Sequence, residues 1–157
     1  MNKELDASLR RDIVPYAVTI FLGAFLLFLV QPLIGKFILP WFGGTPGVWT
    51  TCLLFFQCVL LAGYAYAHCL NYFLPVRKQV MVHGVLLFLV LISLPITPSD
   101  SLKPDGEESP VMAILTLLSL SIGLPYLALS ATGPLVQAWY SKAHPDSSPY
   151  RLYALSN

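Results

Sequence analysis

The stretch that decides the fold runs from Gln31 to His68 and reads QPLIGKFILPWFGGTPGVWTTCLLFFQCVLLAGYAYAH. An apolar segment ends there in Gln-Pro and leads into residues 40–47, which include three glycines and two prolines in eight positions. Such a composition predicts a tight turn. A second apolar segment starts at Trp49 and ends in Tyr and His residues. Apolar segments joined by short loops recur along the chain, a pattern typical of transmembrane helices.

The composition indicates an all-α membrane protein. Of the 157 residues, 56% are hydrophobic and 11% are charged, whereas soluble domains carry about 25% charged residues. The net charge is +1 and no run rich in Lys or Arg occurs, so we expect no nucleic-acid partner. The three cysteines lack the spacing of metal ligands, which favours free thiols and no metal site.

Hydropathy predicts about four transmembrane helices in one domain, residues 13–139. A bilayer needs about 20 helical residues per crossing, so the first and last spans are long enough to tilt or bend. Pro32 predicts a kink in the first span, and Pro125 and Pro134 predict a bent or broken fourth span. The predicted spans are about 13–39, 48–68, 80–96 and 111–139, with a tail at 1–12, loops at 69–79 and 97–110, and a loop plus the start of a truncated fifth span at 140–157.

The basic residues predict the orientation of these spans. Seven of the nine Lys and Arg residues fall in the tail, in the loop after the second span and in the segment after the fourth. Loops rich in Lys and Arg stay on the cytoplasmic side. We therefore expect the N-terminal tail and the segment 140–157 to be cytoplasmic.

Polar side chains within the spans are the candidate functional residues, because each is costly in a bilayer unless it has a partner. Gln57, Tyr64 and His68 are seven and four residues apart, so they share one face of the second span. The fourth span carries a stripe of polar and small residues. Together with Gln31 near the Pro32 kink, these faces could form hydrogen bonds to a small polar solute. The candidate substrate-binding residues are Gln31, Gln57, Tyr64, His68, Tyr126 and Gln137, and the stripe is Ser119, Gly123, Tyr126, Ser130, Gly133 and Gln137.

Helix packing is the alternative explanation for the same residues. Small residues allow helix backbones to approach closely, and amides or hydroxyls cross-link neighbouring helices. Lys36 is explained by a side chain that extends to the outer interface. His83 is as well explained by structure as by function. No catalytic motif occurs, and carboxylates are confined to the tail, the loop 97–110 and Asp146, so we expect neither an enzyme nor a cofactor.

Two blocks of the sequence resemble a known family. One is the quoted stretch, with its Pro-Trp-Phe-Gly-Gly-Thr-Pro turn, and the other is GLPYLALSATGPLVQAWYSKAHPDSSPYRLYALSN, from Gly123 to Asn157. Both resemble the N-terminal membrane region of bacterial proteins that fuse a major-facilitator-like part to a spermidine-synthase-like part. The resemblance implies a bacterial inner membrane and a major-facilitator-like partial bundle. In that family further spans follow, often with a Rossmann-like catalytic domain. This domain is absent here, so no aminopropyltransferase activity is implied.

Three functional hypotheses follow. The first is a multi-pass module that acts as a scaffold or as part of a solute pathway. The second is a small transporter that assembles from several copies of the chain. The third is a membrane anchor for a separately encoded aminopropyltransferase-like enzyme. The partners these hypotheses require are the lipid bilayer, the remaining spans or soluble domain of a split protein, and further copies of the chain.

Overall fold

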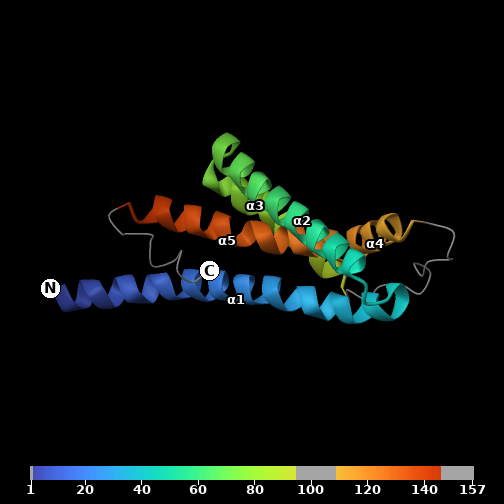
Figure 1. Ribbon diagram of the computed structural model, residues 1–157. Coiled ribbons are helices and arrows are strands. Elements are labelled where there is room, and N and C mark those ends of the chain that lie inside the picture. The colour runs from blue at the N-terminus through green and yellow to red at the C-terminus, as the bar shows by residue number, and fades with distance from the viewer. Residues whose placement is uncertain (1, 95–108, 146–157) are drawn as a thin grey trace.

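The computed structural model describes residues 2–94 and 109–145, with side chains from residue 13 onward. Throughout these ranges the regular structure is helical, which confirms the predicted all-α fold (Figure 1). The last three elements follow one another without a break and form one long helical segment. The elements are α1 (Asn2–Phe42), α2 (Pro46–Phe73), α3 (Val76–Ile92), α4 (Pro110–Leu118), the π-helical turn η2 (Ser119–Gly123) and α5 (Leu124–Ala143).

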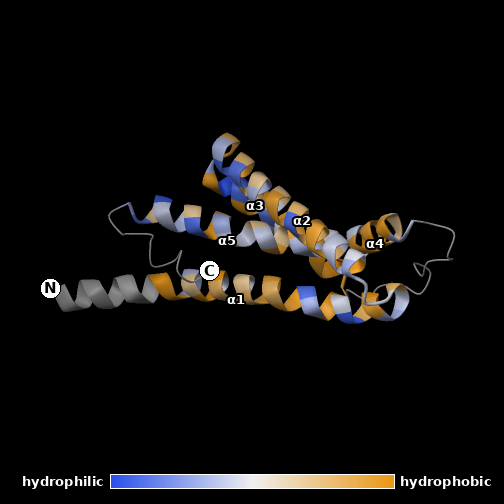
Figure 2. Cartoon of the chain, viewed as in Figure 1, coloured by the Kyte–Doolittle hydropathy of each residue, from blue (hydrophilic) through white to orange (hydrophobic). Residues whose placement is uncertain are grey.

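Within the described residues, three helical segments are long and apolar enough to cross a membrane: Ile13–Phe42, Pro46–Phe73 and Pro110–Ala143. Hydrophobic residues cover most of α1 beyond residue 12 and most of α4 (Figure 2). Large apolar side chains such as Phe28, Leu61 and Met81 are each 69% exposed, as expected for helices that lipid surrounds. These features indicate a membrane protein. α3 has 17 residues, fewer than the about 20 that a bilayer core requires, so the count of four spans stays a prediction.

α5 is the central helix of the bundle. It packs against α1, α2 and α3, whereas the consecutive helices α1 and α2 touch each other at few points. In Figure 1, α5 runs alongside α1, and α2 crosses it obliquely. Each of the three apolar clusters includes residues of α5: Tyr126 in the first, Val136 and Tyr140 in the second, and Ala131 and Leu135 in the third.

The connections between helices are shorter than the sequence predicts. α1 continues through Pro40 and ends at Phe42. The next residue, Gly43, has a φ of 78°, which suits a residue without a Cβ. The Gly43 amide donates to the Leu39 carbonyl (2.9 Å) and closes the last turn. The predicted turn at 40–47 therefore starts too early. Pro40 removes one backbone donor near the end of α1, but it does not prevent the last helical turn.

The predicted loop at 69–79 is also wrong for most of its length. α2 continues to Phe73 and α3 begins at Val76, so Leu74 and Pro75 alone connect them. The Leu74 amide donates to the Leu70 carbonyl (3.0 Å), and the Gln79 amide donates to the Pro75 carbonyl (3.1 Å). These backbone bonds complete the last turn of α2 and the first turn of α3. The end of the third predicted span, the loop 97–108 and the predicted start of a fifth span lie outside the described residues.

The π-helical turn Ser119–Gly123 interrupts the last helical segment just before Pro125. A proline ring clashes with the carbonyl four residues earlier, and a single wider turn relieves such a clash. The break predicted from Pro125 is thus confirmed as a change of helix type. Pro134 lies inside the α-helical segment α5.

Gly63 marks the closest approach of α2 to α5. A Cβ built on Gly63 would overlap the Ser130 Oγ and would lie 3.0 Å from the Ser130 Cβ and 3.1 Å from the Leu127 carbonyl oxygen. The Leu127 carbonyl belongs to the backbone of α5, so it cannot rotate away. A methyl group at position 63 therefore requires the two helices to separate.

Substituting Gly63→Ala should lower the free energy of unfolding by about 1–3 kcal/mol, the usual effect of overpacking. The measurement is a denaturing-detergent titration of the purified chain followed by circular dichroism. Gly84→Ala is the matched control, because a Cβ on Gly84 meets no atom within 4 Å. Equal stability of the two variants would show that the crossing is loose.

Candidate solute cavity

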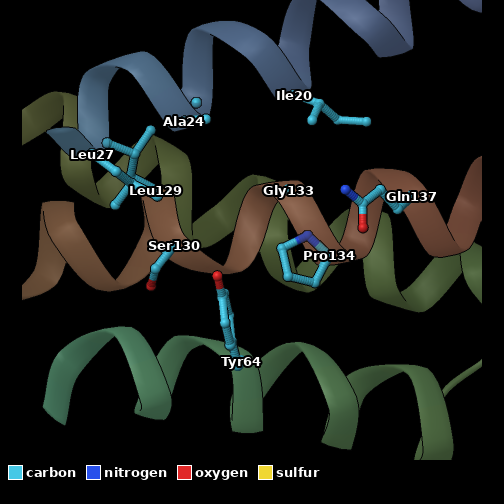
Figure 3. Close-up of a pocket in the computed structure, with 10 residues that line it drawn as sticks. Ile20, Ala24, Leu27, Tyr64, Leu129, Ser130, Gly133, Pro134 and Gln137 are labelled. Atoms are coloured by element: carbon cyan, nitrogen blue, oxygen red, sulfur yellow. The ribbon is translucent and has the colours of Figure 1, made fainter. Parts of the chain in front are cut away.

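A cavity of about 230 Å³ lies among α1, α2 and α5. α1 supplies an apolar wall that includes Gly23 and Leu27. α2 supplies Tyr64, and α5 supplies Ser130 and Gln137 beside apolar and small residues. In Figure 3 the Tyr64 side chain points from α2 toward α5. Polar groups from helices far apart in the sequence therefore meet in one space.

Two glycines leave room for this cavity. Gly23 on α1 and Gly133 on α5 both line it. A Cβ built on either glycine meets no atom within 4 Å. The helices are held at their separation by larger neighbours such as Ile20, which is 1% exposed. The missing side chains at positions 23 and 133 are thus one source of the open volume.

The cavity offers hydrogen-bonding groups without formal charge. Tyr64, Ser130 and Gln137 are its polar side chains, and none of the lining residues that the structure describes is charged. The Ser130 hydroxyl donates its hydrogen to the Leu127 carbonyl (2.9 Å). Because a hydroxyl has one hydrogen, the Ser130 oxygen can then only accept a further hydrogen bond.

Gln31 and Tyr126 form a hydrogen bond one helical turn beyond the cavity. The Gln31 Nε2 donates to the Tyr126 hydroxyl at 3.2 Å, and the Tyr126 side chain is 2% exposed. Phe56 packs against the Tyr126 ring with 4.9 Å between the centroids. Gln31 also lines a second cavity of about 230 Å³. That cavity is mostly apolar, so the hydrogen bond lies between a polar space and an apolar one.

The structure therefore divides the six predicted site residues into three groups. Tyr64 and Gln137 line the polar cavity, and Gln31 and Tyr126 bond to each other beside it. Gln57 and His68 line neither cavity. Both are exposed, and so is Tyr64, at 48%. His68 stacks on Tyr72 with 6.3 Å between the ring centroids.

Gln79 and His83 are polar residues whose importance the sequence does not reveal. They are the buried residues of α3, at 0% and 2% exposure. Gln79 accepts a hydrogen bond from the Trp139 Nε1 (2.7 Å) and donates to the Leu74 carbonyl (2.7 Å). The available signal was their spacing of four, which puts both on one face of an otherwise apolar helix.

The contact between His83 and Thr132 identifies the hydrogen on the imidazole ring. The Thr132 hydroxyl donates to the Ala128 carbonyl (2.8 Å), so its oxygen must accept from the His83 Nε2 at 3.1 Å. A neutral ring then has its lone pair on Nδ1. That Nδ1 and the nearby Tyr66 hydroxyl are buried without a hydrogen-bond partner in the described structure.

No group of three or more His, Cys, Asp or Glu side chains suited to a metal occurs in residues 2–94 and 109–145. Cys52, Cys58 and Cys69 are free thiols; Cys52 is buried, whereas Cys58 and Cys69 are exposed.

The bond between Gln31 and Tyr126 should appear as a coupling energy in a double-mutant cycle of Gln31→Leu and Tyr126→Phe. We expect about 0.6 kcal/mol, and at most about 1.7 kcal/mol, the range of interhelical hydrogen bonds in membrane proteins. The readout is the free energy of unfolding in mixed micelles. The control cycle pairs Tyr126→Phe with Gln57→Leu, whose exposed side chain should give no coupling. Equal coupling in both cycles would contradict the assignment.

No protein-family model matches the chain, and neither a curated protein nor a solved structure does. The resemblance to the major-facilitator-like and spermidine-synthase-like fusion proteins therefore stays a hypothesis. What the cavity can bind follows from its own side chains.

Proposed function

We propose that the chain is a multi-pass module of a bacterial inner membrane in which α1, α2 and α5 enclose part of a pathway for a small polar solute. The carrying observation is the cavity of about 230 Å³ with Tyr64, Ser130 and Gln137 on its polar side. Packing alone gives no reason for open space beside these groups, since interiors are normally filled.

The proposed topology has four spans, with α3 as the third and the N-terminus in the cytoplasm. The basic residues support this orientation. The Lys142 ammonium near the end of α5 donates to the Asn71 side chain near the end of α2, and Arg77 and Lys78 begin α3. Gln137 lies six residues before Ala143, a rise of about 9 Å along the helix. The cavity therefore belongs to the cytoplasmic half of the proposed bundle.

The proposal assigns no enzymatic activity to the chain. A module of this kind would work with further spans or with a soluble partner of a split protein, as the family resemblance implies. Lipid or such spans would cover the apolar side chains that α1 and α3 expose.

A homo-oligomeric transporter is a second candidate. The observation that favours it is the exposure of α1. Only 11% of the most apolar 18-residue window of this helix is buried within the chain. A second copy could cover this face. Crosslinking in mild detergent tests this candidate, and a strictly monomeric species would exclude it.

In a variant without native cysteines, Gly133→Cys should react with a membrane-impermeant thiol reagent supplied on the cytoplasmic side. A side chain at position 133 faces open space, so the thiol fits and would lie in a water-filled cavity. The measurement is the labelling rate in sealed vesicles of defined orientation. Leu120→Cys is the matched control, because Leu120 is 70% exposed on the outer surface and lipid should shield it.

The opposite result is expected at Ser101→Cys, in the predicted loop 97–110. This thiol should react from the outside alone, and cytoplasmic labelling would overturn the topology. Failure of Gly133→Cys to react faster than Leu120→Cys would overturn the solute pathway.

A further inference from the structure

The chemistry of the cavity also indicates which solutes it binds, an inference that rests on the proposed function. Its walls differ in character. The α1 side consists of apolar or small residues, including Ala24 and Leu27. The opposite side has all the polar side chains of the lining, Tyr64, Ser130 and Gln137, beside Leu129, Gly133 and Pro134. A ligand that fits must therefore have polar atoms on one edge and carbon on the other.

The cavity contains no group that could neutralise an ion. The acidic and basic residues of α1, α2 and α5 that the structure describes lie outside its lining. An ion moved into such a low-dielectric site without a partner loses far more solvation energy than neutral hydroxyls or amides can return. Diamines and dicarboxylates should therefore bind poorly, although their carbon chains would fit the volume.

The polar wall includes one fixed acceptor. Ser130 is 1% exposed and its hydrogen is committed to the Leu127 carbonyl. A ligand that reaches the Ser130 oxygen must accordingly donate to it. An ether presents acceptors alone and would leave that oxygen unpaired at a cost of about 1–3 kcal/mol if water were excluded.

We propose that the cavity binds small uncharged solutes that carry hydroxyl or amide donors on one edge, such as aliphatic diols. The volume sets their size. A water molecule occupies about 30 Å³ in the liquid, so 230 Å³ corresponds to about eight waters. A diol of four carbons lies within this limit and can place its carbon chain against α1.

Protection of Gly133→Cys from the thiol reagent tests the ligand class, with the full chain in lipid nanodiscs. Four probes of similar length are compared: 1,4-butanediol, 1,2-dimethoxyethane, putrescine and succinate. They differ in charge and in donor capacity, while their chains are alike. Butanediol at about ten times its dissociation constant should slow labelling about tenfold, as simple occupancy requires. The other three should leave the rate unchanged.

Ser130→Ala removes the fixed acceptor and should raise the butanediol concentration needed for protection about two- to tenfold, the effect of one hydrogen bond. Ser119→Ala is the matched control, since Ser119 is exposed and outside the cavity. An unchanged labelling rate without probe shows that the cavity has kept its shape in both variants.

The outcomes separate the two proposals. If Gly133→Cys is labelled no faster than the Leu120→Cys control, the solute pathway itself is overturned. Normal labelling with protection by putrescine or succinate, or with no protection by any probe, overturns the ligand class and leaves the pathway standing. Equal protection by dimethoxyethane and butanediol overturns the requirement for a donor.

Discussion

The close crossing of α2 and α5 at Gly63 and Ser130 is the constraint on which the rest of the bundle depends. A helix approaches another this closely where a side chain is missing, and the Ser130 hydroxyl lies where a Cβ on Gly63 would be. Lipid gives no hydrophobic drive for helices to associate, so such contacts determine membrane packing. With α5 fixed against α2 by Ser130, Tyr126 meets Gln31 of α1 and Gln137 lines the cavity.

The opposite side of α5 holds α3 by different means. α3 is apolar nearly all round, yet its buried residues are Gln79 and His83. Apolar contact cannot favour one face of such a helix over another in lipid. The hydrogen bonds of Gln79 with Trp139 and of His83 with Thr132 can favour one face, because they require one rotation of α3 about its axis. Polar side chains thus orient α3, although they were unremarkable in the sequence.

The sequence predicted the helical class, which follows from hydropathy and a period near 3.6 residues. Of the predicted stripe, the residues from Tyr126 to Gln137 lie on α5, whereas Ser119 and Gly123 fall in the π-helical turn, where Ser119 is exposed. The sequence could not predict which way the face of Gln57, Tyr64 and His68 points. Periodicity gives a shared face, but the direction depends on contacts between helices distant in the chain. Gln79 was missed for a related reason. Pro75 and two basic residues resemble a loop, whereas backbone bonds, together with the bond from the Gln79 side chain to the Leu74 carbonyl, complete the helix ends on either side.

Packing and binding, the two explanations for polar residues in the spans, turn out to be compatible at Ser130. Its hydrogen satisfies the Leu127 carbonyl within α5, its hydroxyl fills the crossing at Gly63, and the residue belongs to the lining of the cavity. A residue in lipid must satisfy its donor internally before it can serve a ligand, since an unpaired donor is costly there. An oxygen has a second lone pair to offer after that requirement is met. Hydroxyl acceptors are therefore suited to recognise a neutral solute in a helix bundle without weakening it.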